Sequence, residues 1–252
     1  MIALLLAAGR GRRLGSERPK ALLEFGGRTL LDRHLENLAS LRGGIEGGIE
    51  TVVVTGFRAE LLDVPRAIHN SRYERGSVIS LAVALDALAS RKDDLLLMDA
   101  DVLYEPSILR DVTALDRGFA IDTRVTPGSE EMMAGVRDGQ VRALRRGHLE
   151  GFALTGENVG FAKIDAASLP ALRAIVAEVE AADADSDYED ALDRFVATHG
   201  ADYVLVGDRA WTEIDFAEDV ERAEQEVLGR LDGGQCWAAR FSRTISAEGI
   251  SG

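Results

Sequence analysis

The feature that most constrains the fold of this 252-residue chain is the alternation of short apolar runs with helix-forming segments over its first 117 residues. Apolar runs of the length expected for strands buried on both faces occupy 2–6, 51–55, 66–69 and 95–98. Between them, 30–41 repeats its apolar residues every three or four positions, and 78–88 is a second helical stretch. Such alternation predicts an α/β fold with a doubly wound, mostly parallel sheet.

The pattern changes after residue 117. Strands are expected at 119–125 and 132–141, where Asp138-Gly139 favours a tight turn, so this part predicts a small β-meander. Further helices and one short strand are expected at 167–181, 188–198, 216–230 and 203–206. We therefore predict a single domain over 1–230, with halves 1–117 and 118–230, and a loosely packed tail over 231–252.

Charge and composition exclude several functional classes. A net charge of −14 argues against a nucleic-acid or acidic-membrane surface, so we expect neither as a partner. The first apolar run is too short for a membrane span and lacks a basic start, which indicates a cytoplasmic protein. The single cysteine, Cys236, excludes an internal disulfide framework and a cysteine-based zinc site.

A loop rich in small residues follows the first strand, in the sequence Leu4-Leu5-Leu6-Ala7-Ala8-Gly9-Arg10-Gly11-Arg12-Arg13-Leu14. Small residues let backbone N–H groups approach phosphate oxygens, which an arginine can grip from outside. The dinucleotide-binding pattern fails because Leu14 stands where its third glycine or alanine belongs, and no Walker Gly-Lys-Ser/Thr occurs. Pro19-Lys20 adds a second cation after a rigid residue.

Leu-Ala-Ala-Gly-x-Gly-x-Arg followed by Pro-Lys resembles the signature loop of the sugar-phosphate and phosphocholine nucleotidyltransferase superfamily. The resemblance implies a Rossmann-like mixed sheet whose 1–117 half binds an NTP and whose 118–230 half binds an acceptor. By that resemblance Arg13 and Lys20 are catalytic and stabilise the α-phosphate. The loop residues implied to contact the nucleotide are Leu6, Ala7, Ala8, Gly9 and Gly11.

Two groups of acids suggest a Mg²⁺ site. Asp99 and Asp101 follow an apolar strand, and strand alternation points both to one side, near the rim where doubly wound sheets bind ligands. The segment 211–215 resembles the Trp-x-Glu-Ile-Asp segment of cytidylyltransferases acting on phosphocholine and 2-aminoethylphosphonate. That resemblance assigns the metal to Asp101 and Asp215, with Asp99 close to the nucleotide. The alternative makes Asp215 a helix cap and the Asp pair ordinary strand-end residues.

The segment 70–81 resembles the part of the same cytidylyltransferases that frames a pyrimidine, which favours CTP. Its nucleotide-binding candidates are Asn70, Gly76, Ser77 and Ser80, although Ser77 could instead cap the helix. Acceptor contacts are expected in the second half, where aromatic faces and carboxylates suit a small amine or quaternary ammonium and a lysine suits a phosphonate or phosphate. These candidates are Asn158, Lys163, Tyr188, Glu189, Asp190, Trp211 and Glu213.

The sequence therefore predicts Mg²⁺-dependent transfer of a nucleotidyl group from an NTP, with CTP favoured, to a small phosphonate or phosphate monoester such as 2-aminoethylphosphonate or phosphocholine. Alternatives within the enzyme class are a sugar-1-phosphate nucleotidyltransferase and a molybdopterin-type transferase. An alternative of another class is a nucleotide-binding module without turnover. The sequence does not fix the oligomeric state, and a homodimer is one option.

Overall fold

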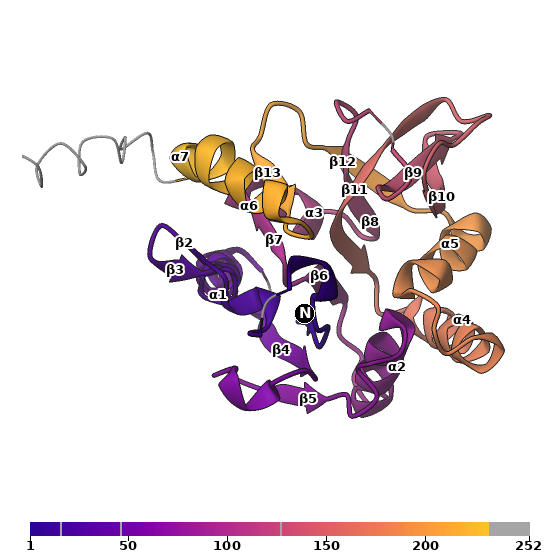
Figure 1. The fold of residues 1–252 in the computed structure, drawn as a ribbon. Coiled ribbons are helices and arrows are strands. Elements are labelled where there is room, and N and C mark those ends of the chain that lie inside the picture. Colours follow the sequence, from indigo (N-terminus) through magenta and orange to yellow (C-terminus); the bar gives the residue numbers. More distant parts are fainter. Residues whose placement is uncertain (16, 46, 127, 232–252) are drawn as a thin grey trace, which may run out of the picture.

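The computed structural model describes residues 1–231 except 16, 46 and 127, and is built on a nine-stranded mixed sheet (Figure 1). The main strand order is β10-β9-β11-β6-β1-β4-β5, with β8 and β12 attached to β11 as a branch. Its first half is parallel and consists of β1 (Ile2–Ala7), β4 (Glu50–Thr55), β5 (Ala67–His69) and β6 (Leu95–Asp99). The predicted α/β fold class is confirmed.

The long strand β11 (Leu154–Ile164) joins the two halves of the sheet, because it runs antiparallel to β6 and also pairs with β8 and β9. The second-half strands are β8 (Gly118–Asp122), β9 (Met132–Arg137), β10 (Gln140–Arg146) and β12 (Asp202–Leu205). The predicted turn at Asp138-Gly139 joins β9 and β10 into a hairpin. However, β8 and β9 each pair with β11, where Glu157 is a partner of both, and they do not pair with each other.

Helices cover both faces of the sheet (Figure 1). One face packs against α2 (Ser77–Ala87), α4 (Leu169–Ala182) and α5 (Tyr188–His199) through buried residues such as Ile79, Leu172 and Phe195. The other packs against α1 (Leu30–Leu41) and α3 (Pro106–Thr113) through Leu38 and Ile108. Burial of these apolar surfaces is the main force that holds the layers together.

A smaller core lies beside the main sheet, where β7 (Val102–Tyr104) pairs antiparallel with β13 (Trp211–Glu213). The chain then forms α6 (Ala217–Arg222), a π-helical segment Ala223–Val227 and α7 (Leu228–Leu231). This succession replaces the single helix predicted over 216–230. The short hairpin β2 (Glu24–Phe25) and β3 (Arg28–Thr29) packs against the same core through Phe25.

Short 3₁₀ turns punctuate the first half at Arg12–Leu14, Lys20–Leu22, Arg42–Gly44 and Ala59–Leu61. Over residues 1–231, with the three gaps already named, no helix combines the length and the apolar character that crossing a bilayer requires. The predicted tail begins at Leu231, which closes α7, and the rest of it, 232–252, lies outside the described residues.

Candidate active site

A cavity of about 350 Å³ opens at the carboxyl ends of β1 and β6, where a doubly wound sheet commonly binds its ligand. Residues from both halves of the chain line it. Those expected from the sequence are Leu6, Ala7, Ala8, Gly9, Gly11, Arg13, Lys20, Ser77, Ser80, Asp99, Asp101, Tyr188, Glu189, Glu213 and Asp215. The structure therefore brings most of the predicted candidates to one place.

The glycine-rich loop and the turn that follows it supply two of the cations of this cavity, Arg13 and Lys20. Gly11 has a φ of 60° and a β-carbon added there would lie 2.8 Å from the Lys20 Cγ atom, so the turn suits only glycine. The loop then enters the 3₁₀ turn that carries Arg13, while Pro19 precedes the turn that carries Lys20. Both basic side chains reach the carboxylates at the end of the sheet.

Lys20 and Arg13 tie these carboxylates together. The Lys20 ammonium donates to Asp101 Oδ2 at 3.0 Å and also contacts Asp215 Oδ1. The Arg13 guanidinium donates to Asp215 Oδ2 at 3.0 Å. Burial alone would lower the pKa of Lys20, but the adjacent carboxylates of Asp101 and Asp215 outweigh it and raise this pKa.

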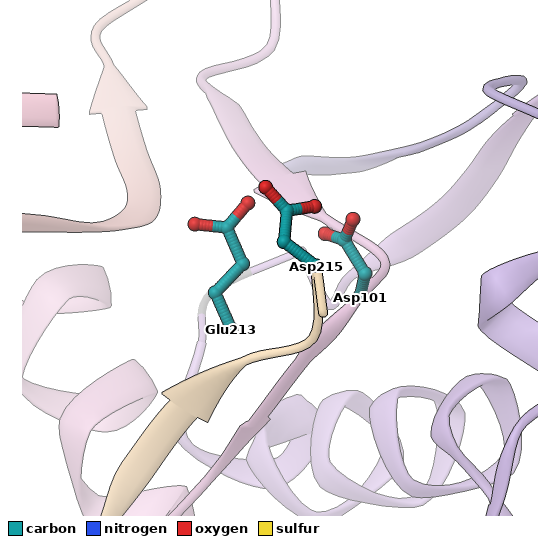
Figure 2. Close-up of side chains that lie close together, drawn as sticks. All are labelled: Asp101, Glu213 and Asp215. Atoms are coloured by element: carbon teal, nitrogen blue, oxygen red, sulfur yellow. The ribbon is translucent and has the colours of Figure 1, made fainter. Parts of the chain in front are cut away.

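Three carboxyl groups meet at this point, from Asp101, Glu213 and Asp215, with one oxygen of each within 4.8 Å of the others. Figure 2 shows them side by side, with Glu213 at the end of β13 and Asp215 on the segment that follows it. An all-oxygen donor set suits a hard divalent cation, and the Lys20 ammonium already provides a positive charge between two of the donors. The residues present therefore fit Mg²⁺.

The pairing of β7 with β13 creates this juxtaposition. It sets Glu213 opposite Val102, and the Ile214 N–H donates to the Asp101 carbonyl at 3.0 Å. The backbone N–H groups of Asp215 and Phe216 both donate to Asp219 Oδ2. Because Asp219 receives these N–H groups, Asp215 is left to face the cations. The helix-cap alternative for Asp215 does not fit this arrangement.

Asp99 lies apart from the three-carboxylate cluster, because β6 ends at Asp99 and the chain turns before Asp101. The expectation that both aspartates face one ion from a continuous strand is therefore wrong. Asp99 instead accepts a hydrogen bond from the Tyr188 hydroxyl at 2.6 Å. A β-carbon at Gly160 would lie 2.5 Å from Asp99 Oδ2, so this glycine makes room for the carboxylate. Burial, followed by the charge of Glu189, raises the pKa of Asp99.

The start of α2 forms the wall expected to face the base. Ser77 and Ser80 line the cavity, whereas Asn70 is buried behind them and donates to Ser80 Oγ at 3.0 Å. Gly76 lies at the cap position, so the expected capping by Ser77 is wrong. The Ser77 hydroxyl instead accepts from the Tyr188 N–H at 2.8 Å and joins α2 to α5. Asn70 and Gly76 are thus placed to position this wall.

A second cavity, of about 310 Å³, adjoins the first and shares Glu213 and Asp215 with it. Trp211 and Phe216 supply its aromatic walls. Further carboxyl groups line it, from Asp122, Glu130, Glu131, Glu157 and Asp219, together with one arginine, Arg222, which pairs with Asp219. Burial, followed by the charge of Glu131, raises the pKa of Glu157 to about 7. This cavity therefore presents a strongly acidic and partly aromatic surface.

Two carboxyl groups of the first cavity, those of Glu213 and Glu189, are held in an environment that penalises charge. Burial, followed by the charge of Asp101, raises the pKa of Glu213 well above its ordinary value. Burial, followed by the charge of Asp187, raises the pKa of Glu189 to about 8. Both groups would gain from a bound cation, which favours the ionised form of a neighbouring carboxyl group.

Three expected acceptor residues lie elsewhere. Lys163 pairs with Leu96 along β11, and its ammonium donates to the Thr113 carbonyl at 3.1 Å and contacts Asp94 at the opposite end of β6. Because β11 runs antiparallel to β6, Lys163 is carried away from the carboxyl ends, so its proposed acceptor contact is not supported. Asp190 accepts from the Asp187 N–H in the capping box of α5. Asn158 is buried outside both cavities.

Sequence reasoning missed several residues that line the first cavity, which are Ala21, Tyr73, Arg75, Ala100, Arg146 and Asp187. The basic pair Arg145-Arg146 was a visible signal, since it closes the strand after the Asp138-Gly139 turn. Its position beside the cavity depends on how β10 pairs with β9, which no local pattern reveals.

Comparison with known proteins agrees with this geometry. The model of the MobA-like NTP transferase domain matches residues 3–178. The bifunctional enzyme IspD/IspF of Clavibacter michiganensis subsp. michiganensis is 29% identical over 97% of this chain and 58% of its own length. The chain thus spans little more than half of that relative, and 23% and 25% of two bifunctional GlmU proteins, from Nostoc sp. and Zymomonas mobilis.

Two solved structures share the fold. The inositol-1-phosphate CTP transferase of T. maritima has a TM-score of 0.70 and 19% identity, over 92% of this chain and 96% of its own. The CTP:phosphocholine cytidylyltransferase LicC of Streptococcus pneumoniae has a TM-score of 0.69 and 20% identity, over 88% and 97%. The expected nucleotidyltransferase class is confirmed, and the chain belongs to the MobA-like NTP transferase domain family.

Proposed function

We propose that this protein catalyses Mg²⁺-dependent transfer of a cytidylyl group from CTP to a small phosphonate or phosphate monoester, with release of pyrophosphate. The observation that carries the proposal is the contact of Lys20 and Arg13 with the carboxylate cluster beside the glycine-rich loop. Cations and metal ligands meet where the triphosphate of a nucleotide would lie on that loop. A glycine-rich surface turn with solvated arginines would not explain why these cations meet a cluster of carboxylates.

The chemistry requires no covalent enzyme intermediate. An ionised oxygen of the acceptor phosphoryl group attacks the α-phosphorus, a new P–O bond forms, and the bond to the bridging oxygen of pyrophosphate breaks. Arg13 and Lys20 stabilise the charge on the α-phosphate and on the leaving group. Mg²⁺ bound by Asp101, Glu213 and Asp215 would supply charge neutralisation and orientation of the phosphates.

The second cavity supports an acceptor that carries a positive group. Glu213 and Asp215 border both cavities, so a molecule in the second could present its phosphoryl group to a nucleotide in the first. Glu157 and the faces of Trp211 and Phe216 suit an ammonium through charge and cation–π attraction. Phosphocholine and 2-aminoethylphosphonate meet these requirements, since each joins an amine or quaternary ammonium to a phosphoryl group.

Cytidine is the base we propose, because two structural neighbours are named as CTP-dependent enzymes and Ser77 and Ser80 offer small polar groups beside the base wall. A guanylyl transfer is the second candidate. A probable molybdenum cofactor guanylyltransferase of Methanosarcina acetivorans is 64% identical over 36 residues, which is 14% of this chain. Sugar-1-phosphate acceptors fit the acidic cavity less well, because they bring no cation to its carboxyl groups.

The test is a matrix of the four NTPs against phosphocholine, 2-aminoethylphosphonate and several sugar 1-phosphates, scored by pyrophosphate release with and without Mg²⁺. We expect release that depends on CTP, Mg²⁺ and one amine-bearing acceptor together. Turnover with GTP alone among the nucleotides would replace the cytidine assignment. No pyrophosphate from any combination, despite measurable binding of CTP, would favour a nucleotide-binding module.

A further inference from the structure

We propose that Arg146, at the end of β10, binds the phosphoryl group of the acceptor. The inference rests on the proposed function, because it assigns a residue to the second substrate of that reaction. Arg146 lines the first cavity from the half of the chain opposite the glycine-rich loop. No sequence motif had assigned it a role.

The requirement for such a residue follows from the charges at the site. An acceptor phosphate or phosphonate brings negative charge into a cavity lined by Asp99, Asp101, Glu189, Glu213 and Asp215. Repulsion among these charges would oppose entry of the acceptor unless a cation held it. Arg13 and Lys20 are committed to the triphosphate, so the acceptor requires a separate cation.

Two further arginines line the cavity, and their surroundings distinguish them. Arg75 lies at the start of α2 and uses two of its nitrogens to bind Asp185, at the edge of the base wall. Arg146 lies on the second-half hairpin, close to the border with the acidic second cavity, since it contacts the carbonyl of Glu130 at 2.6 Å. Arg222 lines the second cavity, but its guanidinium donates to Thr212 and Asp219. Arg146 is therefore the arginine that we assign to an acceptor spanning the two cavities.

Glu130 contacts both cationic sides of the site. Its carboxylate contacts Arg13 at 3.1 Å, while its backbone carbonyl accepts from Arg146. The two guanidinium groups thus contact the same residue from opposite sides of the site. A group held by Arg146 would lie within reach of a phosphate held by Arg13, which is the proximity that in-line transfer requires.

An acceptor phosphoryl group could replace the present partner of Arg146, which is Asp187. The Arg146 guanidinium donates to Asp187 Oδ2 at 3.0 Å, and the two side chains are 43% and 44% exposed. An exposed ion pair of this kind contributes little stability, so a dianionic phosphoryl group can replace the carboxylate at small cost. The fork of the guanidinium suits two oxygens of a phosphate or phosphonate at once.

The experiment compares Arg146→Gln with Arg145→Gln as the matched control. Arg145 is the preceding residue on β10, is also cationic and exposed, and pairs with Asp193 outside the cavity. Steady-state kinetics would use CTP with phosphocholine and with 2-aminoethylphosphonate. We expect Arg146→Gln to raise the KM of the acceptor at least about tenfold while the KM of CTP changes less than about threefold. Arg145→Gln should leave both values near wild type.

Two more variants separate acceptor binding from a structural role. Arg146→Lys keeps the charge without the fork and should recover part of the lost acceptor affinity. Asp187→Asn removes the ion pair, keeps the bond from Arg146 to the Glu130 carbonyl and can still cap α5, so the acceptor KM should stay constant or fall. An increase in Asp187→Asn equal to that in Arg146→Gln, or an equal rise in both KM values of Arg146→Gln, would overturn the proposal.

Failure of the proposed function is recognised separately. If wild type releases no pyrophosphate, calorimetric titration of phosphocholine and 2-aminoethylphosphonate into the protein with Mg²⁺ and α,β-methylene-CTP still tests Arg146. Binding to wild type that Arg146→Gln loses supports the assignment even without turnover. Equal binding by both proteins, or no binding by wild type, rejects it.

Discussion

Lys20 occupies the space between two carboxylates that are also the expected metal ligands. Its ammonium contacts Asp101 and Asp215, and these contacts raise its pKa against the effect of burial. Lys20 and a divalent cation therefore compete for the same negative charge. A nucleotide changes this balance, because its phosphates offer Lys20 another partner.

We predict that Lys20→Ala lowers kcat by about 10²–10³-fold, the scale of losing one preorganised donor, yet binds metal more tightly when no nucleotide is present. The measurement is Mn²⁺ binding by electron paramagnetic resonance, with Mn²⁺ as the probe, alongside turnover. Arg12→Ala is the control, because Arg12 is an exposed cation of the same loop that does not line the cavity. Unchanged Mn²⁺ affinity or near-normal kcat in Lys20→Ala would contradict the competition.

Glu157 provides a pH test at the level of a single residue. Its pKa of about 7 lies above the ordinary value of 4.5, so folding favours the neutral acid. This contribution to stability is present below pH 4.5 and is lost as the pH rises through 7. Glu157→Gln cannot ionise. Relative to wild type, its free energy of unfolding should therefore rise between pH 5 and pH 8, by up to about 2 kcal/mol after allowance for solvent screening.

Urea denaturation at the two pH values measures this difference directly. Glu150→Gln, at an exposed position outside both cavities, serves as the control for the substitution itself. A difference between wild type and Glu157→Gln that does not change with pH would show that burial does not penalise the Glu157 carboxylate.

Among the elements, those with a strong local pattern were predictable. The repeat of apolar residues in α1 and the apolar runs of β1, β4 and β6 gave nearly the observed bounds. The eight-residue helix α3 was missed, although Pro106 stands at its start, because two turns are too short for a periodic pattern. The break of the last helix into α6, a π-helical segment and α7 likewise has no local signal.

Site residues that belong to a local sequence motif were predictable, whereas those whose position depends on strand pairing were not. The loop through Lys20 was recognisable because its glycines and cations are adjacent in sequence. Glu213 lies in the carboxylate cluster because of the register of β13 against β7. Lys163 lies outside the site because β11 runs antiparallel to β6. Register and direction are long-range properties, which a local pattern does not determine.

The junction between α2 and α5 gives a prediction at the scale of elements. A β-carbon at Gly76 would lie 2.1 Å from the Ser186 carbonyl, so alanine there must separate the two helices. We expect Gly76→Ala to destabilise the fold by about 2 kcal/mol, which lowers Tm by roughly 4–8 °C in a domain of this size. Because Ser77 joins the same helices, CTP binding should weaken as well.

Thermal denaturation and CTP titration check both effects. Gly44→Ala is the control, because a β-carbon there meets no atom within 4 Å and the backbone is not in the left-handed region. Equal Tm values for wild type and Gly76→Ala would show that the helices tolerate separation.

At the scale of the whole molecule, a strongly negative protein can still bind an anion, because cationic side chains are gathered in the first cavity. The net charge of −14 repels polyanions in general, while Arg13 and Lys20 supply positive charge only inside the cavity. The two halves of the chain meet there, with the loop from the first and Glu213 and Asp215 from the second. Ligand binding should therefore stabilise the domain as a unit.

This coupling predicts a cooperative effect of metal and nucleotide on stability. With Mg²⁺ and CTP at about one hundred times the dissociation constant, linkage adds about 2.7 kcal/mol and should raise Tm by roughly 5–10 °C. Either ligand alone should give a much smaller shift. Without nucleotide, Lys20 occupies the carboxylates that would bind Mg²⁺, and without Mg²⁺ these carboxylates repel the phosphates of CTP. Asp215→Asn should remove most of the combined shift, because it deletes one metal ligand and one partner of Arg13. Asp116→Asn, at an exposed position outside both cavities, should retain it. A full shift in Asp215→Asn would show that metal and nucleotide bind without the Asp215 carboxylate.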